Sequence, residues 1–107
     1  MSDPQTPTPP PSPTVPLGKL ADVLRSTIRW RILRELANGD QLMVIQLAER
    51  IRQSPDLTSK HLAILRAAGI VIQGRNRLYQ IAPHFLADKT EGLIDFGCCL
   101  LRLNVLA

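Results

Sequence analysis

The spacing of apolar residues changes once along this chain, and that change limits the folds the chain can adopt. Between residues 17 and 68, leucine, isoleucine, valine and alanine recur every three or four positions, as on one face of an α-helix. From Ile70 to Ile81, on either side of a turn, the period is two, which is typical of β-strands. We therefore predict a mainly α fold with a small β-hairpin.

Local signals divide the helical region into four helices. Their apolar stripes run through residues 17–24, 28–36, 42–51 and 58–65. Ser26 or Thr27 can cap the second helix. The strongest start signal is Ser54-Pro55, before the fourth helix. Ser54 can accept a hydrogen bond from an unpaired backbone N–H, and Pro55 lacks the donor that would be unpaired at the first helical position. Gly69 is predicted to end this helix.

The predicted hairpin has a basic turn. We expect its apolar side chains on one face: Ile70, Ile72, Tyr79 and Ile81. The turn between the strands reads Gly-Arg-Asn-Arg at residues 74–77. Arg75 and Arg77 have little packing value at such a tip, and they are well placed to contact phosphates or a narrow minor groove. An ordinary solvated turn is the alternative interpretation.

The chain is predicted to have three parts. Residues 1–16 hold seven of the nine prolines and one charged side chain, so we expect a disordered tail and not a signal peptide; docking of this tail on an aromatic groove is the alternative. Residues 17–87 form the main domain. A fifth helix, which Pro83 can begin, is expected to mediate dimerisation over residues 88–107. Its apolar surface would come from Leu86, Leu93, Phe96, Leu100 and Leu103.

Positive charge is concentrated in the middle of the chain. The formal net charge is +4, but residues 17–87 carry eleven Lys and Arg against five Asp and Glu, a net +6. A basic surface on a small domain attracts polyanions such as DNA by releasing condensed counterions. A solvated charged face is the alternative. No segment has the roughly 20 apolar residues that a membrane span needs.

The two cysteines, Cys98 and Cys99, are adjacent. A neighbouring pair with no other cysteine argues against a disulfide framework and favours a reducing cytoplasm as the setting. In an apolar helical segment we expect both thiols to be buried and inert. A redox or thiol sensor is the alternative, and it would need a thiolate with a lowered pKa.

Two stretches of the sequence resemble the ArsR-type bacterial transcriptional regulators. One reads LADVLRSTIRWRILRELANGDQLMVIQLAERI and the other SPDLTSKHLAILRAAGIVIQGRNRLYQIAP, so the resemblance covers about residues 17–87. Its most specific part is Ser-Lys-His-Leu through Ala-Gly-Ile-Val, at residues 59–71. The resemblance implies a winged helix-turn-helix of about five helices plus a two-stranded antiparallel wing. It also implies a homodimer, formed by the first and last helices, that binds double-stranded DNA.

By this resemblance the fourth helix is the recognition helix. The DNA-binding residues that we predict on the helix and the wing are Ser54, Asp56, Ser59, Lys60, His61, Arg75, Asn76 and Arg77. Lys60 is assigned to a phosphate, and Ser59 to a phosphate or a base edge. His61 contacts the DNA backbone or helps to pack the helix. Asp56 stabilises the helix N-terminus, or instead lowers affinity or selects a cytosine edge.

The sequence departs from the metal-sensing members of the family. Many of them have Cys-Val-Cys at the start of the third helix, where this chain has Met43-Val44-Ile45 and therefore no thiolate. Residues 88–107 contain no histidine, and we interpret their acidic residues, Asp88, Glu91 and Asp95, as a solvated stripe. We expect no metal site and no cofactor.

The chain also shows no set of residues typical of an enzyme. It has no evident nucleophile–base pair and no glycine-rich phosphate loop. We therefore predict a cytoplasmic, sequence-specific DNA-binding transcriptional regulator that acts as a dimeric repressor. Its effector and any protein partner are not indicated by the sequence. A winged-helix module for protein–protein interaction, with little or no DNA binding, is the alternative.

Overall fold

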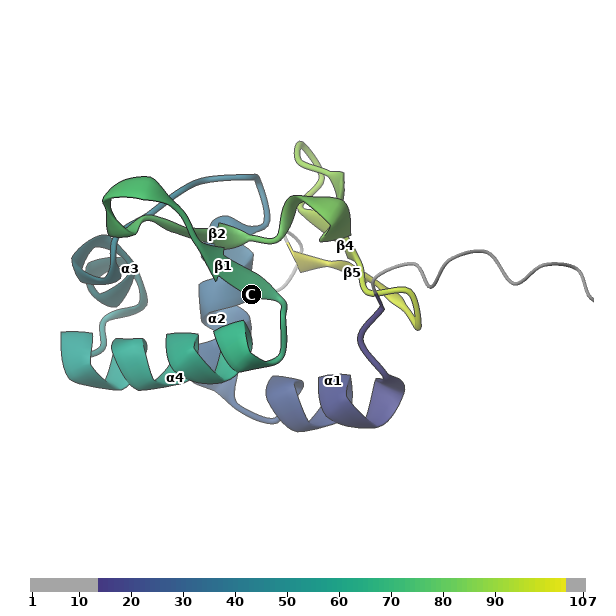
Figure 1. The fold of residues 1–107 in the computed structure, drawn as a ribbon, viewed down its shortest axis with the longest axis horizontal. Coiled ribbons are helices and arrows are strands. Elements are labelled where there is room, and N and C mark those ends of the chain that lie inside the picture. Colours follow the sequence, from purple (N-terminus) through teal and green to yellow (C-terminus); the bar gives the residue numbers. More distant parts are fainter. Residues whose placement is uncertain (1–13, 104–107) are drawn as a thin grey trace, which may run out of the picture.

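The computed structural model describes residues 14–103, which form four α-helices, a two-stranded hairpin and a three-stranded sheet (Figure 1). The helices are α1 (Leu17–Leu24), α2 (Thr27–Leu36), α3 (Val44–Ile51) and α4 (Pro55–Ala67). The strands are β1 (Val71–Gln73), β2 (Tyr79–Ile81), β3 (Leu86–Asp88), β4 (Leu93–Asp95) and β5 (Leu100–Arg102). Helix-turn-helix followed by a hairpin is the winged helix that the sequence predicted, with four helices in these residues where about five were expected.

Side-chain caps fix where the helices begin. The Ser26 hydroxyl accepts the N–H of Arg29 at 3.3 Å, and the Ser54 hydroxyl accepts the N–H of Leu57 at 3.1 Å. Both caps satisfy a donor that has no partner within its helix, so α2 and α4 begin as predicted. The third helix begins later than expected, at Val44. The reason is tertiary, because the backbone of Leu42 is engaged with the hairpin.

One apolar core runs through the described residues. Helices α2, α3 and α4 contribute its largest part, and the fully buried side chains from these helices include Ile32, Leu33, Leu36, Leu47, Leu62 and Leu65. Thr58 is the buried polar side chain of this region, and its hydroxyl donates to the carbonyl oxygen of Ser54 at 2.9 Å. The buried side of α4 therefore keeps its polar atom satisfied within the first turn.

The hairpin pairs with a connector as well as with itself. Strands β1 and β2 are antiparallel, with Val71 opposite Ile81 and Gln73 opposite Tyr79. Tyr79 also exchanges two backbone hydrogen bonds with Leu42, at 2.7 and 3.0 Å. These two bonds place the start of α3 directly beside β2.

The prediction of which side chains of the first strand are buried is wrong by one residue. Val71 is buried, whereas Ile72 points to the other face and is 38% exposed. Ile70 is buried before the strand begins, in the turn that follows Gly69 at φ +79°. Because successive side chains of a strand alternate between faces, starting the strand one residue later reverses the assignment.

The predicted fifth helix is also wrong. Pro83 begins only a short 3-10 turn, Pro83–Phe85, and the chain then forms the antiparallel sheet β3-β4-β5. Gly92 and Gly97 interrupt the expected helix with φ of +63° and +85°, a region that favours glycine. A helix cannot contain residues with these positive φ values, so the chain turns at both glycines. The apolar residues of this region are therefore buried as part of strands and turns and not on one face of a helix.

Two carboxylates build the turns of this sheet. One Asp88 oxygen accepts the backbone N–H groups of Thr90 and Glu91 at 2.9 and 3.2 Å. One Asp95 oxygen accepts the N–H of Gly97 at 2.8 Å. Aspartates that bind backbone donors two or three residues later favour turns over helix. Two of the three acidic residues that we assigned to a solvated helical stripe, Asp88 and Asp95, therefore shape the backbone.

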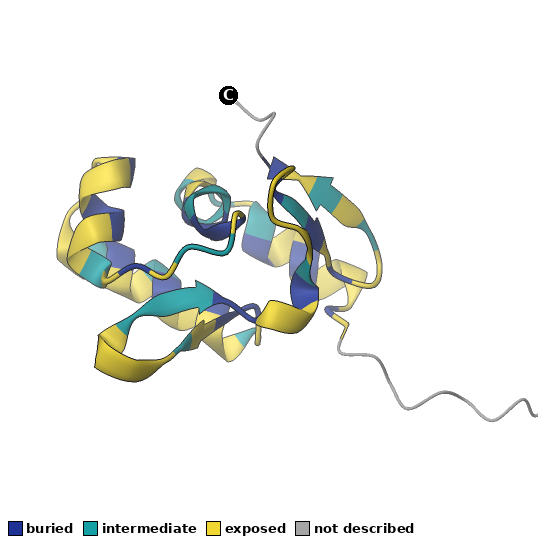
Figure 2. Cartoon of the chain, turned by 90° about the horizontal axis from the view of Figure 1, so that it is seen from above, coloured by how far each residue is buried: buried dark blue, intermediate teal, exposed yellow. Residues whose placement is uncertain are grey.

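The sheet covers the part of the core next to α1, at the other end of the structure from α3 (Figures 1 and 2). Ile94, Phe96 and Leu103 are buried there, and the Phe96 ring lies 5.6 Å from that of Phe85. Val15 is buried in the same cluster and donates its N–H to the Phe96 carbonyl at 3.0 Å. The packed region thus includes residue 15, which we had placed in the tail. Residues 1–13 and 104–107, and with them most of the predicted tail, lie outside the described residues.

Candidate nucleic-acid interface

Helix α4 has one buried and one exposed side. Thr58, Leu62 and Leu65 are buried against the core. The opposite side presents residues spaced three or four apart, all of them exposed: Asp56, Ser59, Lys60 and Ala63. The helix therefore offers a narrow, mostly polar ridge of small and charged side chains, the shape that can enter a major groove.

Ser54 stands at the start of this ridge. Its hydroxyl oxygen is used in capping α4, but the O–H remains a donor that can reach an anion. Asp56 lies in the first turn, where its charge complements the helix dipole. The ridge thus combines the predicted residues Ser54, Asp56, Ser59 and Lys60 at one end of α4.

His61 lies between α4 and α2 and differs from the other predicted residues of the helix. It is only partly exposed, and its Nδ1 is 3.5 Å from Nη1 of Arg29. Burial, and then the Arg29 charge, lower the pKa of His61, so the ring is neutral at pH 7. Arg29 also donates to the carbonyl oxygens of Val23 and Asp22, at 2.7 and 3.1 Å. This arrangement favours the packing role of His61 over a cationic contact with phosphate.

The wing ends in a tight turn. The N–H of Leu78 donates to the carbonyl of Arg75 at 3.2 Å, and Asn76 and Arg77 both have φ of +59°. These are the features of a type I′ turn, whose second central position usually holds glycine. An arginine there costs about 1–2 kcal/mol of backbone strain. Arg75, Asn76 and Arg77 are all exposed, and Figure 2 shows this tip projecting away from the buried core.

The ridge and the wing are joined by a contact that the sequence analysis missed. Arg66, near the end of α4, donates from Nη1 to Oε1 of Gln73 on β1 at 3.0 Å. The bond connects the two elements that carry the predicted DNA-binding residues. No sequence signal could have identified it, because the pairing depends on how β1 folds back along α4.

A second group of arginines lies beside the start of α4 and was not predicted as a site. Between α2 and α3 is a hollow of about 170 Å³, lined by Arg31, Arg34, Glu35, Arg50, Ile51 and Arg52. Arg50 is paired with Glu35 at 3.5 Å and with Asp40 at 3.6 Å. Arg52 ends α3 in the left-handed region, at φ +58°, two residues before the cap of α4. Of this group, Arg52 places its positive charge near the start of the ridge.

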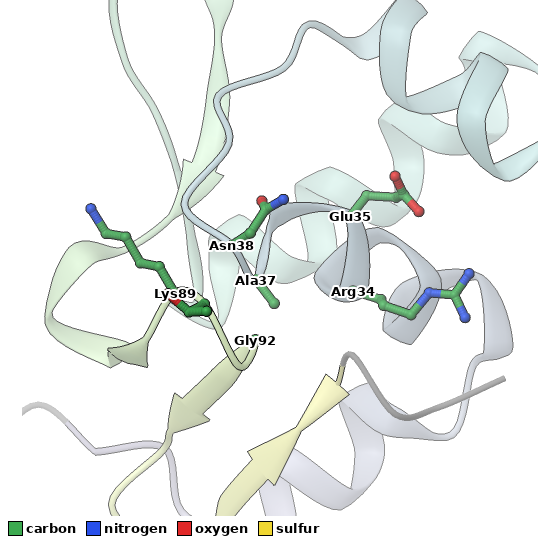
Figure 3. Close-up of a pocket in the computed structure, with 7 residues that line it drawn as sticks. Arg34, Glu35, Ala37, Asn38, Lys89 and Gly92 are labelled. Carbon is green, nitrogen blue, oxygen red and sulfur yellow. The ribbon is translucent and has the colours of Figure 1, made fainter.

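Another hollow, of about 320 Å³, lies between the end of α2 and the β3–β4 turn. Figure 3 shows that the charged ends of Arg34, Glu35 and Lys89 point in different directions around it. Such a set does not converge on a single bound group. Within residues 14–103, no three His, Cys, Asp or Glu side chains are grouped so that they could hold a metal ion.

Cys98 and Cys99 are not buried in a helix, contrary to our expectation. They lie in the turn between β4 and β5, where Cys98 is exposed and Cys99 is partly buried. Burial raises the pKa of Cys99, and the hydrogen bond with Cys98 and the charges of Cys98 and Asp95 raise it further. Because the thiolate is the reactive form, this shift disfavours reaction at Cys99.

Comparison with known proteins gives the same placement for the helix-turn-helix. Residues 26–73 match the model of the family described as bacterial regulatory protein, arsR family. Two curated proteins, each named HTH-type transcriptional repressor SmtB, come from Mycobacterium tuberculosis strains CDC 1551 / Oshkosh and ATCC 25618 / H37Rv. Each is 36% identical to this chain over 88 residues, which is 78% of this chain and 64% of the relative. The chain thus spans just under two thirds of the length of these relatives.

No solved structure matches the chain. Among residues 14–103, no helix is both long enough and apolar enough to cross a membrane.

Proposed function

We propose that the chain is a member of the ArsR family of bacterial regulatory proteins, whose model residues 26–73 match, and that it is a sequence-specific repressor that binds double-stranded DNA. The observation that carries this proposal is the position of two elements. The exposed ridge of α4 is joined through Arg66 and Gln73 to a wing tip that bears two arginines. One helix can then occupy the major groove while the wing reaches the flanking backbone or minor groove.

Each predicted residue receives a role in this arrangement. Lys60 binds a phosphate, and Ser59 a phosphate or a base edge. Ser54 caps α4 and donates its O–H to the DNA backbone. The charge of Asp56 stabilises the N-terminus of α4. Arg75, Asn76 and Arg77 contact phosphates or the minor groove, for which their exposure suits them. His61 packs the helix beside Arg29, as its lowered pKa and their 3.5 Å contact favour.

We further propose a homodimer acting in the cytoplasm by occluding a promoter. A two-fold axis would place two α4 helices about one DNA turn apart on a pseudo-palindromic operator. The C-terminal helix that was expected to pair with α1 in the dimer is replaced by the sheet β3-β4-β5. We therefore propose that α1 and β5 form the dimer interface. These elements carry the exposed apolar residues Leu17 and Leu100, at 65% and 58% exposure.

We propose that repression by this protein is not controlled through a metal site at the start of α3. Met43 and Ile45 stand where metal-sensing relatives have thiolates, and neither side chain is an anionic ligand. We propose that the protein is a regulator and not an enzyme, in accord with the family whose model it matches.

The salt dependence of duplex binding tests this function. Each phosphate that a cationic side chain neutralises contributes about 0.9 to the slope of log affinity against log salt. Replacing both wing arginines, Arg75→Gln with Arg77→Gln, should therefore weaken binding to all sequences and reduce the slope by up to about 2. The control is Arg25→Gln, which changes an exposed arginine immediately after α1 that pairs with Asp22 at 3.3 Å and should leave the slope unchanged.

Two results would contradict the proposal. Duplex binding that is weak and independent of length at every salt concentration would favour the protein-interaction module instead. A normal slope in the double variant would remove the wing from the interface.

A further inference from the structure

A groove of about 380 Å³ lies between the start of α3 and the hairpin, outside the proposed recognition ridge. It is lined by Met43, Val44, Ile45, Gln73, Arg77 and Tyr79. Gln73 and Tyr79 are opposite one another in the hairpin, so they project from the same face, and the start of α3 forms the other wall. The volume falls in the range of about 300–1,000 Å³ that is usual for small-molecule sites.

The backbone holds the two walls in place. Leu42 and Tyr79 exchange two hydrogen bonds, at 2.7 and 3.0 Å, immediately before the groove-lining residues of α3. The N–H of Met43 donates to Oε1 of Gln46 at 2.8 Å, which fixes the first turn of the helix. The groove is therefore preformed, and a ligand would not have to order its walls.

The floor of the groove is apolar and open to water. Met43 is 42% exposed and Ile45 is 66% exposed, although both are large apolar side chains. Single exposed apolar residues are common, but here they share one concave surface with Val44 and the Tyr79 ring. Covering them with a hydrocarbon would remove apolar area from water without rearranging the core.

The rim carries a single charge. Among the six residues that line the groove, Arg77 alone is ionised at pH 7, and no acidic side chain lies among them. Oε1 of Gln73 already accepts from Arg66, so the amide NH2 is the group of this side chain that is left to donate. A guanidinium and an amide donor beside an apolar wall complement a carboxylate attached to a hydrocarbon.

We propose that this groove binds a small apolar carboxylate. The hydrocarbon lies on Met43, Val44 and Ile45, and the carboxylate pairs with Arg77. Arg77 is also a residue of the wing tip, so the ligand and the DNA backbone compete for one guanidinium. This coupling rests on the proposed function, whereas binding in the groove does not.

The probe is 2-naphthoate, with 2-naphthalenemethanol as its uncharged counterpart, each titrated into the full-length chain while backbone amide shifts are recorded. We expect naphthoate to shift amides of residues 43–45, 73 and 77–79. Arg77→Gln should weaken naphthoate by up to about fivefold, as for one exposed ion pair, and leave the alcohol unchanged. Ile45→Gln should weaken both compounds about threefold or more, because it removes part of the apolar wall.

The matched control is Ile72→Gln, which changes an exposed isoleucine on the other face of the hairpin and should alter neither affinity. The amide spectra themselves report whether each variant folds. The proposed site would be overturned if naphthoate shifted no amides, or only amides outside the groove. It would also be overturned if Arg77→Gln weakened the binding of both compounds equally.

A second arm tests the coupling. With naphthoate at about ten times its dissociation constant for the wild type, the dissociation constant for duplex should rise by up to about tenfold in the wild type. At the same naphthoate concentration it should rise by no more than about fourfold in Ile45→Gln, whose duplex affinity without ligand stays unchanged. Naphthoate bound in the groove with no effect on duplex would overturn the coupling. A wild type that binds no duplex would refute the proposed function, while the amide shifts still decide the groove.

Discussion

The helices of residues 17–67 and the sheet of residues 86–102 both place large apolar residues three or four positions apart, yet their backbones differ. In the helical region, Gly39 and Gly69 stand after helix ends, both with positive φ. In the sheet region, Gly92 and Gly97 adopt positive φ between strands, each supported by an aspartate turn nearby. The position of the glycines, more than the spacing of the apolar residues, separates the two regions.

The two regions also differ in what they present to solvent. The helical region and the wing hold the exposed ridge of α4 and the arginines of the turn. The sheet contributes Ile94, Phe96 and Leu103 to the same core and carries no predicted DNA-binding residue. We interpret the sheet as the support of α1, and so, through the shared core, of the helix-turn-helix.

The largest effect is expected from Phe96→Ala, which tests whether the regions unfold together. Phe96 is fully buried against Phe85, and removing such a ring costs about 3–5 kcal/mol. Urea unfolding followed by the helical circular-dichroism signal should show one transition at a lower midpoint. Thr90→Ala, in the exposed turn between β3 and β4 of the same sheet, should change stability by less than about 0.5 kcal/mol. An unchanged helical midpoint in Phe96→Ala would separate the sheet from the core.

A pair of glycine substitutions sharpens the contrast at an intermediate magnitude. Gly97 has φ +85°, and a Cβ there would overlap the Thr14 side chain, so Gly97→Ala should destabilise the chain by about 1–2 kcal/mol. Gly18 lies in α1 with open space around a new Cβ, so Gly18→Ala should stabilise it by about 0.5–1 kcal/mol. Thermal unfolding measures both. Equal effects of the same sign would show that backbone conformation does not distinguish the regions.

The smallest effect concerns pH and is confined to the helical region. The pKa of His61 is lowered from its ordinary 6.5, so above pH 6.5 the ring is neutral in both folded and unfolded chains. As the pH falls below 6.5, the unfolded chain takes up the proton first, and the free energy of unfolding decreases until the lowered pKa is passed. His61→Gln should reduce this loss below about pH 6.5, because it removes the ring whose protonation is disfavoured by partial burial and by the Arg29 charge. An identical loss in both proteins would show that His61 is not the source of the pH dependence.

Much of the helical region could be predicted because its signals are local. Ser26 and Ser54 cap helices through bonds to residues three positions away, and these pairs are visible in any sequence. The hairpin turn at residues 74–77 and the exposed side of α4 follow from the same short-range rules. The predicted contacts of individual side chains with DNA remain proposals.

The errors came where two structures could bury the same apolar residues. Leu93, Phe96, Leu100 and Leu103 fit a helical stripe, and nothing in their spacing excludes strands. The bonds of Asp88 and Asp95 to the backbone, and the positive φ of the glycines, decide in favour of the sheet. The prediction of the buried face of β1 was wrong for a related reason, since a shift of one residue exchanges the positions of Ile72 and Val71 on the buried and exposed faces.

The sequence by itself determined the winged helix-turn-helix, because caps, helix stops and apolar periods act within a few residues of one another. Only the tertiary structure decided how α4 joins the wing through Arg66 and Gln73, how Leu42 brings the start of α3 beside Tyr79, and what form residues 86–102 take. These features depend on pairs that are distant along the chain or on a choice between backbones of similar local cost. The choice is made by whichever arrangement buries Phe96 and its neighbours while satisfying the backbone hydrogen bonds.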